Sequence, residues 1–358
     1  MKSGWQTMKL GDVMQLEYGK PLDPIDRSPQ GRYPAYGANG VKDRTDKFYR
    51  DTPSIIVGRK GSAGEITLTE EKFWPLDVTY FAEFDRQSYD LRFLYYLLVT
   101  LDLPSMAKGV KPGINRNDVY ALPVHVPLLP EQQRIVGILD QAFDGIATAK
   151  TNAEKNRQNA RALFESHLQS IFTQRGEGWV ETTVDKISTN LDSKRVPITK
   201  NVRTSGEYPY YGASGIVDYV ADYIFDGDTL LISEDGANLL ARSTPIAFSV
   251  SGKYWVNNHA HILKFENMAT QRFVEFYLGS IKLDEYITGA AQPKLNQKAL
   301  NSIPVPIPKA VKMQASIVEG IETLQRETLH LESLYQRKLA ALDALKQSLL
   351  HQAFSGAL

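Results

Sequence analysis

The sequence contains no cysteine, which excludes disulfide bonds and metal sites built from thiolates. It also has no apolar run near the ~20 residues that a membrane span requires, and its first residues lack the apolar core of a signal peptide. Formal net charge is zero, with 41 basic and 41 acidic residues, so overall electrostatics does not indicate a nucleic-acid binder. We therefore expect a cytoplasmic protein without membrane contact that recognises its partners through local surface.

Motifs of catalysis are missing as well. The glycines of Gly58, Gly61 and Gly64 have neither dinucleotide nor Walker spacing, and we interpret them as a structural turn. No motif for a methyl-donor pocket, a Ser or Cys nucleophile or a nucleotide loop is present. We expect a chain that is not an enzyme by itself and has no cofactor of its own.

Two histidines alternate in Asn257-Asn258-His259-Ala260-His261, so on a strand both side chains would face the same side, as metal ligands could. No carboxylate spacing nearby completes a site, and the repeat described below has Val78 and Tyr80 at these places. We favour satisfied polar side chains at a sheet edge and expect no metal.

A coiled-coil pattern is present twice. Apolar residues step by four and three along each segment, and each position of the first recurs 182 residues later, as with Leu139 and Ile321. Both patterns turn polar at the same place, Asn156 and Lys338. The predicted seams include Ile135, Leu139, Ile146, Asn156 and Leu163 in the first segment, and Ile317, Ile321, Leu324, Leu331, Lys338 and Leu345 in the second.

The segments before these helices repeat too. Residues 33–40 read Tyr-Pro-Ala-Tyr-Gly-Ala-Asn-Gly and residues 208–215 read Tyr-Pro-Tyr-Tyr-Gly-Ala-Ser-Gly, a strand followed by a turn. A short buried strand follows in each half, at 54–58 and 229–233. The expected order is a globular domain at 1–126, a long helix at 127–175, a second globular domain at 176–307 and a second helix at 308–358.

The fold class predicted is therefore α+β: two pseudo-symmetric mixed α/β globular domains separated by an antiparallel coiled-coil pair of long helices. A fused repeat tends to pack about a two-fold axis, which sends the two helices in opposite directions. If the axis passes near the middle of the helices, Asn156 and Lys338 lie close together and fix the register.

Several loops combine glycine with side chains able to contact DNA. Glycine matters there because backbone without a Cβ can approach a phosphate closely. Arginine, lysine, asparagine and glutamine are also the residues that read base edges. Opposite charges at aligned positions, Arg59-Lys60 and Glu234-Asp235, are compatible with two different ligands. The candidates are Arg59, Lys60, Lys108, Lys111, Asn115 and Arg116 in the first half, and Lys194, Arg195, Lys200, Arg203, Gln292, Lys294, Gln297 and Lys298 in the second.

The repeated Tyr-Pro-x-Tyr-Gly-Ala-x-Gly motif, the Pro-Glu-Gln-Gln sequence at 130–133 and the closing residues 350–356 together resemble the specificity (S) subunit of type I restriction-modification systems. The resemblance covers nearly the whole chain. It departs at 308–314, where the second helix lacks the Glu-Gln pair.

This resemblance implies a DNA-reading subunit with two target recognition domains, each addressing one half of a bipartite asymmetric site in double-stranded DNA. The helix pair would set the spacing and would dock two modification (methyltransferase) subunits. S-adenosylmethionine, ATP and magnesium would be bound only by partner subunits, namely the modification and restriction subunits, and not by this chain.

Two other classes remain open. A structural adaptor with two protein-binding globules on a helical strut explains the neutral charge, but not the basic glycine loops. An enzyme with a site between the globules fits worst, because the aligned loop residues differ in charge.

Overall fold

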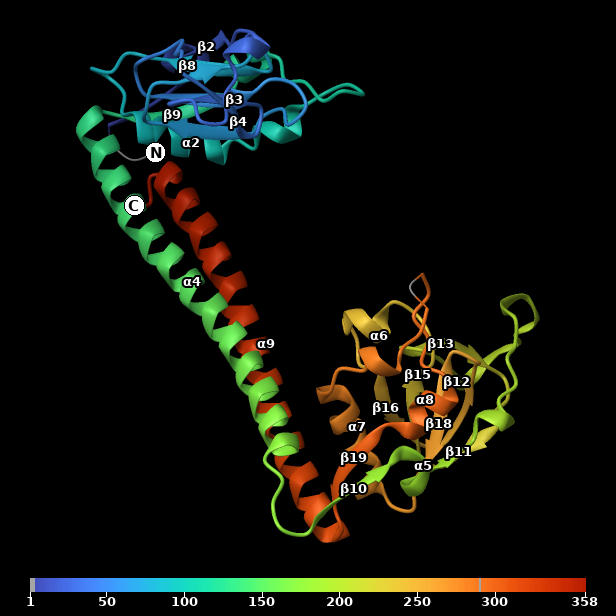
Figure 1. Cartoon of the computed structure of the whole chain (residues 1–358). Helices are drawn as coiled ribbons and strands as arrows, with labels where there is room; N and C mark the ends of the chain where they lie inside the picture. Colours follow the sequence, from blue (N-terminus) through green and yellow to red (C-terminus); the bar gives the residue numbers. More distant parts are fainter. Residues whose placement is uncertain (1–3, 290) are drawn as a thin grey trace. The chain divides into compact units, whose positions relative to one another are not determined.

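The computed structural model describes residues 4–289 and 291–358, which divide into two compact units. Of these residues, unit 1 contains 4–154 and 337–358, and unit 2 contains 155–289 and 291–336. Two helices of 45 residues each, α4 (Leu129–Thr173) and α9 (Val311–Ser355), contribute one part to each unit (Figure 1). Each unit is thus assembled from a globular domain and from segments of both long helices.

Unit 1 contains a four-stranded sheet in the order β2-β8-β5-β6, a three-stranded sheet β4-β3-β7 and the pair β1-β9. Strands β3 and β7 are parallel, and the other pairs are antiparallel. The elements are β1 (Trp5–Lys9), α1 (Leu10–Val13), β2 (Gln15–Tyr18), η1 (Pro24–Asp26), β3 (Tyr33–Gly37), β4 (Gly40–Thr45), β5 (Ser54–Gly58), β6 (Ile66–Thr69), β7 (Trp74–Pro75), β8 (Thr79–Glu83), α2 (Leu91–Thr100), η2 (Leu103–Met106), α3 (Arg116–Tyr120) and β9 (Pro123–Pro127).

Unit 2 repeats this topology with one added edge strand, β14: its sheets are β11-β18-β15-β16 and β13-β12-β17-β14, and its pair is β10-β19. Its parallel pair, β12 and β17, corresponds to β3 and β7. The elements are β10 (Trp179–Thr183), α5 (Val184–Ile187), β11 (Thr189–Asn190), η3 (Asp192–Lys194), η4 (Lys200–Val202), β12 (Ser205–Gly212), β13 (Gly215–Val220), β14 (Phe225–Asp226), β15 (Thr229–Ser233), α6 (Asn238–Ala241), β16 (Ala247–Val250), β17 (Lys253–Val256), β18 (Ala260–Lys264), α7 (Met268–Ser280), η5 (Asp284–Tyr286), α8 (Gln297–Ser302) and β19 (Pro304–Pro308).

The local sequence explains the main elements. Strands β5 and β15 are buried along their whole length, as their continuous apolar runs predict. The Asp90 side chain accepts hydrogen bonds from the first turn of α2, and Asn267 does the same for α7. The proline-rich strands β9 and β19 each pair with one strand only, since proline cannot donate to a second neighbour.

The two long helices run antiparallel, as predicted. In unit 1 the Lys150 ammonium lies 2.7 Å from the Asp343 carboxylate, and in unit 2 Arg157 donates to the Gln336 amide oxygen at 2.8 Å. Later residues of α4 therefore face earlier residues of α9. The core of unit 1 contains the start of α4 and the end of α9, and the core of unit 2 contains the opposite two ends.

The predicted seam holds only in part. The seam positions that are buried are Ile135, Leu139, Ile146 and Ile321, and those that are half-buried are Ile317 and Leu324. The two polar positions, Asn156 and Lys338, are exposed and belong to different units, so the predicted contact between them stays a prediction. Three leucines of the predicted seam are exposed: Leu163 (65%), Leu331 (38%) and Leu345 (47%).

The buried stripe moves by one residue along each helix. In α4 it passes through Ala153, Phe164 and Leu168 rather than through Leu163. An α-helix with 3.6 residues per turn drifts by about 20° per heptad unless it supercoils. Over several heptads this drift carries the strict seven-residue positions out to solvent, which is the error in the prediction.

A buried glutamine anchors the start of each long helix. Gln132 donates to the carbonyls of Ser88 (3.0 Å) and Pro127 (2.9 Å) and accepts from the Asp90 amide at 2.8 Å. At the aligned place in α9, Gln314 donates to the Pro308 carbonyl at 2.7 Å. The missing Glu-Gln pair therefore does not remove this anchor, because Gln314 replaces it.

Replacing Gln132 with leucine is expected to lower the free energy of unfolding by about 2 to 3 kcal/mol, because buried amide and carbonyl groups lose their partners. The neighbouring Gln133 is exposed, and its replacement with leucine serves as the control, with a change within about 0.5 kcal/mol. Urea denaturation of both variants measures the difference. Equal stabilities would contradict the anchoring role.

Candidate nucleic-acid interface

In unit 1 three segments distant in sequence meet at one end of the β2-β8-β5-β6 sheet. The Arg59 amide donates to the Val78 carbonyl (2.8 Å), the Ile114 amide donates to the Arg59 carbonyl (3.1 Å), and the Gly61 amide donates to the Pro112 carbonyl (2.9 Å). These bonds join the turn after β5, the residue before β8 and the loop before α3. We call this arrangement the loop frame.

Unit 2 contains the same loop frame. The Glu234 amide donates to the His259 carbonyl (2.9 Å), the Leu295 amide donates to the Glu234 carbonyl (2.8 Å), and the Gly236 amide donates to the Pro293 carbonyl (3.0 Å). Every bond of the first frame thus has a counterpart in the second. The glycine needed for the turn is at positive φ in both, at 82° for Gly61 and 107° for Gly236.

The loop that completes each frame is closed in the same way. The backbones of Lys108 and Gly113 exchange hydrogen bonds at 2.9 and 3.0 Å, and those of Thr288 and Lys294 exchange them at 2.9 and 2.8 Å. The backbone is therefore common to both units, and the difference between them lies in the side chains that it presents.

The side chains of the first frame are aromatic and cationic. The guanidinium carbons of Arg59 and Arg116 lie 5.3 and 4.8 Å from the centre of the Tyr18 ring, which is 47% exposed. Arg59 also donates to the Asp77 carbonyl. Below them the Tyr80 hydroxyl donates to the Ile114 carbonyl at 3.3 Å.

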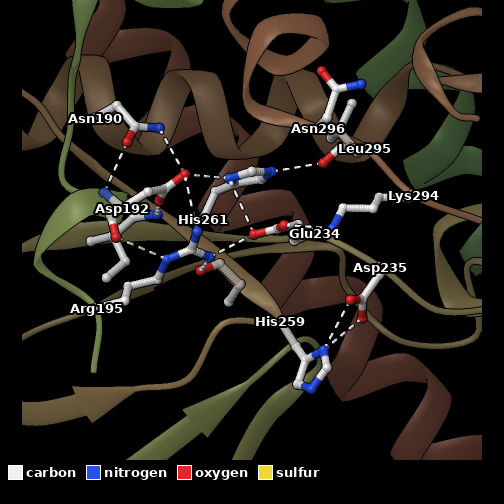
Figure 2. A network of polar contacts seen from close by, with 12 residues as sticks. Asn190, Asp192, Arg195, Glu234, Asp235, His259, His261, Lys294, Leu295 and Asn296 are labelled. Carbon is white, nitrogen blue, oxygen red and sulfur yellow. Dashed lines mark hydrogen bonds and ion pairs between the residues drawn. The ribbon is translucent and has the colours of Figure 1, made fainter. Parts of the chain in front are cut away.

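The second frame has a buried ionic cluster instead, shown in Figure 2. Strand β18 is central, and its His261 donates from Nε2 to the Leu295 carbonyl at 2.7 Å, as Tyr80 does to Ile114. Nδ1 of His261 lies 2.6 Å from an Asp192 oxygen and 3.8 Å from a Glu234 oxygen. We call Asp192, Arg195, Glu234, His261 and Lys294 the ionic cluster.

Cations in the cluster compensate its carboxylates. Arg195 lies 2.6 Å from Glu234 and 3.7 Å from Asp192, and Lys294 lies 3.1 Å from Glu234. Burial alone would raise the pKa of both carboxyls, yet the hydrogen bonds and charges of His261 and Arg195 hold the pKa of each below its ordinary value. Both groups are therefore ionised at neutral pH.

Ligand-type atoms of Asp192, Glu234 and His261 lie within 4.8 Å of one another, close enough for a metal ion. Both nitrogens of His261 already face an oxygen of the protein, and both carboxylates face a protein cation. These residues fit a closed ion-pair network rather than an open metal site. The expectation of histidines at a sheet edge is wrong for His261, which lies in a central strand.

The structure sorts the DNA-contact candidates into three groups. Three have structural roles: Arg195 in the ionic cluster, Arg203 paired with Asp218 at 3.0 Å, and Asn115, whose side chain caps α3. Arg59 and Arg116 lie against Tyr18. The exposed candidates are Lys60, Lys108, Lys111, Lys194, Lys200, Gln292, Lys294, Gln297 and Lys298, of which Lys108 is paired with Asp118 and Lys294 with Glu234.

Sequence reasoning missed the residues that underlie these loops, namely Tyr18 and Tyr80 in unit 1 and Asp192 in unit 2. Their signal was available in part, because Tyr80 aligns with His261 between the repeated strands. The strand register confirms this alignment: Tyr80 of β8 pairs with Val57 of β5, and His261 of β18 pairs with Ile232 of β15.

Comparison with known proteins identifies the class. A family model, type I restriction modification DNA specificity domain, matches residues 2–157 and again residues 176–340. The chain belongs to this family, whose role is DNA sequence specificity in type I restriction-modification.

Curated relatives agree with this assignment, and solved structures share the fold. The EcoDI type I restriction enzyme specificity subunit of Escherichia coli is 24% identical over 99% of this chain and 88% of its own length. A Haemophilus influenzae protein described as a type I restriction enzyme specificity subunit is 34% identical, but over only 47% of this chain and 41% of that protein. The HsdS subunit of Thermoanaerobacter tengcongensis shares the fold, with a TM-score of 0.64 and 17% identity over 100% of this chain and 98% of its own.

A chain from a study of complex assembly in a type I restriction-modification system has a TM-score of 0.78 at 16% identity, covering 100% of this chain and 99% of its own. No helix in the described part of the chain is both long and apolar enough to cross a membrane.

Proposed function

We propose that the chain reads a bipartite, asymmetric site in double-stranded DNA, one half with each globular domain. The observation that carries this proposal is the loop frame, which recurs bond for bond in both domains with different side chains. A common backbone sets a common mode of approach, and side chains at its surface select bases. Lys60 on the first frame and Asp235 at the aligned place on the second carry opposite charges, so the two surfaces do not prefer the same base edges.

The antiparallel long helices support a second part of the proposal, in which they set the length of the unread gap and dock two modification subunits. Exposed leucines on these helices, Leu163, Leu331 and Leu334 in unit 2, offer apolar surface for a partner. The chain itself is proposed to be non-catalytic. S-adenosylmethionine, ATP and magnesium would be held by the modification and restriction subunits, and the complex would act on DNA in the cytoplasm.

Exchange of residues 1–128 for the same segment of another family member is expected to change one half of the methylated motif and leave the other half unchanged. The exchange includes β9 because β9 pairs along its length with β1. N6-methyladenine is mapped by sequencing DNA from cells that contain the chimera and the co-encoded modification subunit.

The unaltered chain is the reference, and the exchange of residues 179–308 is the matched control for the other half. A change in both halves from one exchange would contradict independent reading. A structural adaptor would give a methylation pattern that does not depend on this chain.

A further inference from the structure

An exposed histidine beside the ionic cluster is held in one orientation by a carboxylate. His259 immediately precedes β18, and Asp235 follows β15 after Glu234. Nδ1 of His259 lies 2.9 Å from each oxygen of Asp235. Figure 2 shows the ring directed at this carboxylate. The imidazole is 48% exposed while the carboxylate is only 16% exposed, so the acid is covered and the ring is open to solvent.

The backbone under this pair is fixed on both sides. The His259 amide donates to the side chain of buried Asn257 at 2.8 Å, and its carbonyl accepts from Glu234 in the loop frame. Within residues 4–289 and 291–358, Nε2 of His259 has no hydrogen-bond partner. The ring therefore presents one free nitrogen from a defined position.

Stability does not account for this arrangement. A histidine–carboxylate contact whose ring is half exposed contributes little to folding, because solvent screens it and the side chains lose rotamer freedom. A polar side chain that is both oriented and open to solvent is instead preorganised for a ligand.

We propose that His259 contacts the edge of one base pair in the DNA half-site read by unit 2, with Asp235 as its positioning residue. This inference rests on the proposed function and assigns the reading to one side chain. With Nδ1 directed to the carboxylate, Nε2 accepts a hydrogen bond when the ring is neutral and donates one when it is protonated. Base edges in the major groove carry both kinds of partner.

The Asp235 carboxylate indicates whether His259 contacts a DNA base or the sugar-phosphate backbone. Asp235 repels phosphate, so a ring backed by it suits a base edge better than the sugar-phosphate chain.

The first domain supports the assignment by contrast. Lys60 stands where unit 2 has Asp235, and Val78 stands where it has His259, on the same backbone. A histidine at this place is therefore not needed to build the frame. It distinguishes what one domain presents from what the other presents.

The test measures methylation by the complex of this chain with its modification subunit. The substrates are duplexes in which each base pair of the second half-site, defined by the domain exchange, is substituted in turn. His259→Ala is expected to reduce discrimination at one position by about 5- to 140-fold and to leave the other positions and the first half-site within about twofold. Asp235→Asn is expected to relax the same position by a smaller factor, because the ring stays but loses its orientation.

Lys264→Ala, an exposed change at the other end of β18, is the control and should alter no position. Unchanged discrimination in His259→Ala overturns the inference, and so does a uniform loss of rate on all duplexes, which indicates a phosphate contact or a structural role. Relaxation at different positions in the two variants overturns the role of Asp235. Each of these results would leave the proposed function unaffected. The proposed function itself is contradicted if the complex with the unaltered chain does not methylate a bipartite motif.

Discussion

Duplication of residues 147–153 in α4 together with residues 340–346 in α9 is expected to lengthen the unread gap of the DNA site by about three base pairs. These heptads lie opposite each other, since Lys150 pairs with Asp343. Seven helical residues add about 10 Å, and B-DNA rises about 3.4 Å per base pair. Sequencing of methylated adenines in cells reports the new gap directly.

The chain with both duplications is also expected to bind its longer site more weakly than the unaltered chain binds the original site. Three base pairs turn the DNA by about 100°, whereas the ~10 Å of one heptad turns a helix pair by only about 25°, given a supercoil pitch of about 150 Å. Duplication in α4 alone leaves seven residues without a partner on α9 and serves as the control, with loss of folding rather than a new gap. An unchanged gap in a folded double insertion would refute the spacing role of the helices.

Arg195→Met is expected to destabilise unit 2 by about 3 to 5 kcal/mol, because it leaves two buried carboxylates without their shared cation. The guanidinium is only 15% exposed and also donates to the Ala260 carbonyl at 2.8 Å. Hydrogen exchange at β15 and β18 follows the opening of this unit separately from unit 1.

The adjacent Lys194 is exposed, and Lys194→Met removes the same charge with little expected effect on exchange. Similar exchange rates in the two variants would contradict a structural role for Arg195 and would return it to the DNA-contact candidates. The measurement therefore distinguishes a structural role of Arg195 from a role in DNA contact.

The same cluster predicts how unit 2 responds to acid. Because the folded pKa of Asp192 and of Glu234 lies below its ordinary value (3.8 and 4.5), their contribution to stability is complete above those values. It is lost as pH falls through the lowered folded pKa values, when both groups become protonated.

Much of the architecture could be predicted because its signals are local or repeated. The helix pair follows from a periodic apolar pattern found twice, and buried strands such as β5 follow from short apolar runs. The direction of pairing followed from the symmetry of a duplicated chain. The burial of Leu163 was predicted wrongly, since a strict heptad overestimates how far the helices supercoil.

The candidate site could be predicted only in outline. Glycine and basic residues pointed to the loops that form the frame, but the frame itself depends on hydrogen bonds between residues far apart in sequence, such as Gly61 and Pro112. Charge alone could not tell Arg195, which is committed to buried carboxylates, from Lys194, which faces solvent. That difference depends on where Asp192 and Glu234 meet in space.

One feature of the first unit bears on how the protein is made. Leu350 and Ala353 are buried in its core, and Phe354 packs 5.1 Å from Phe93. During synthesis this core therefore stays incomplete until residues 350–354 have left the ribosome, while residues 155–336 already contain everything that unit 2 requires. The domain translated first is therefore expected to finish folding last.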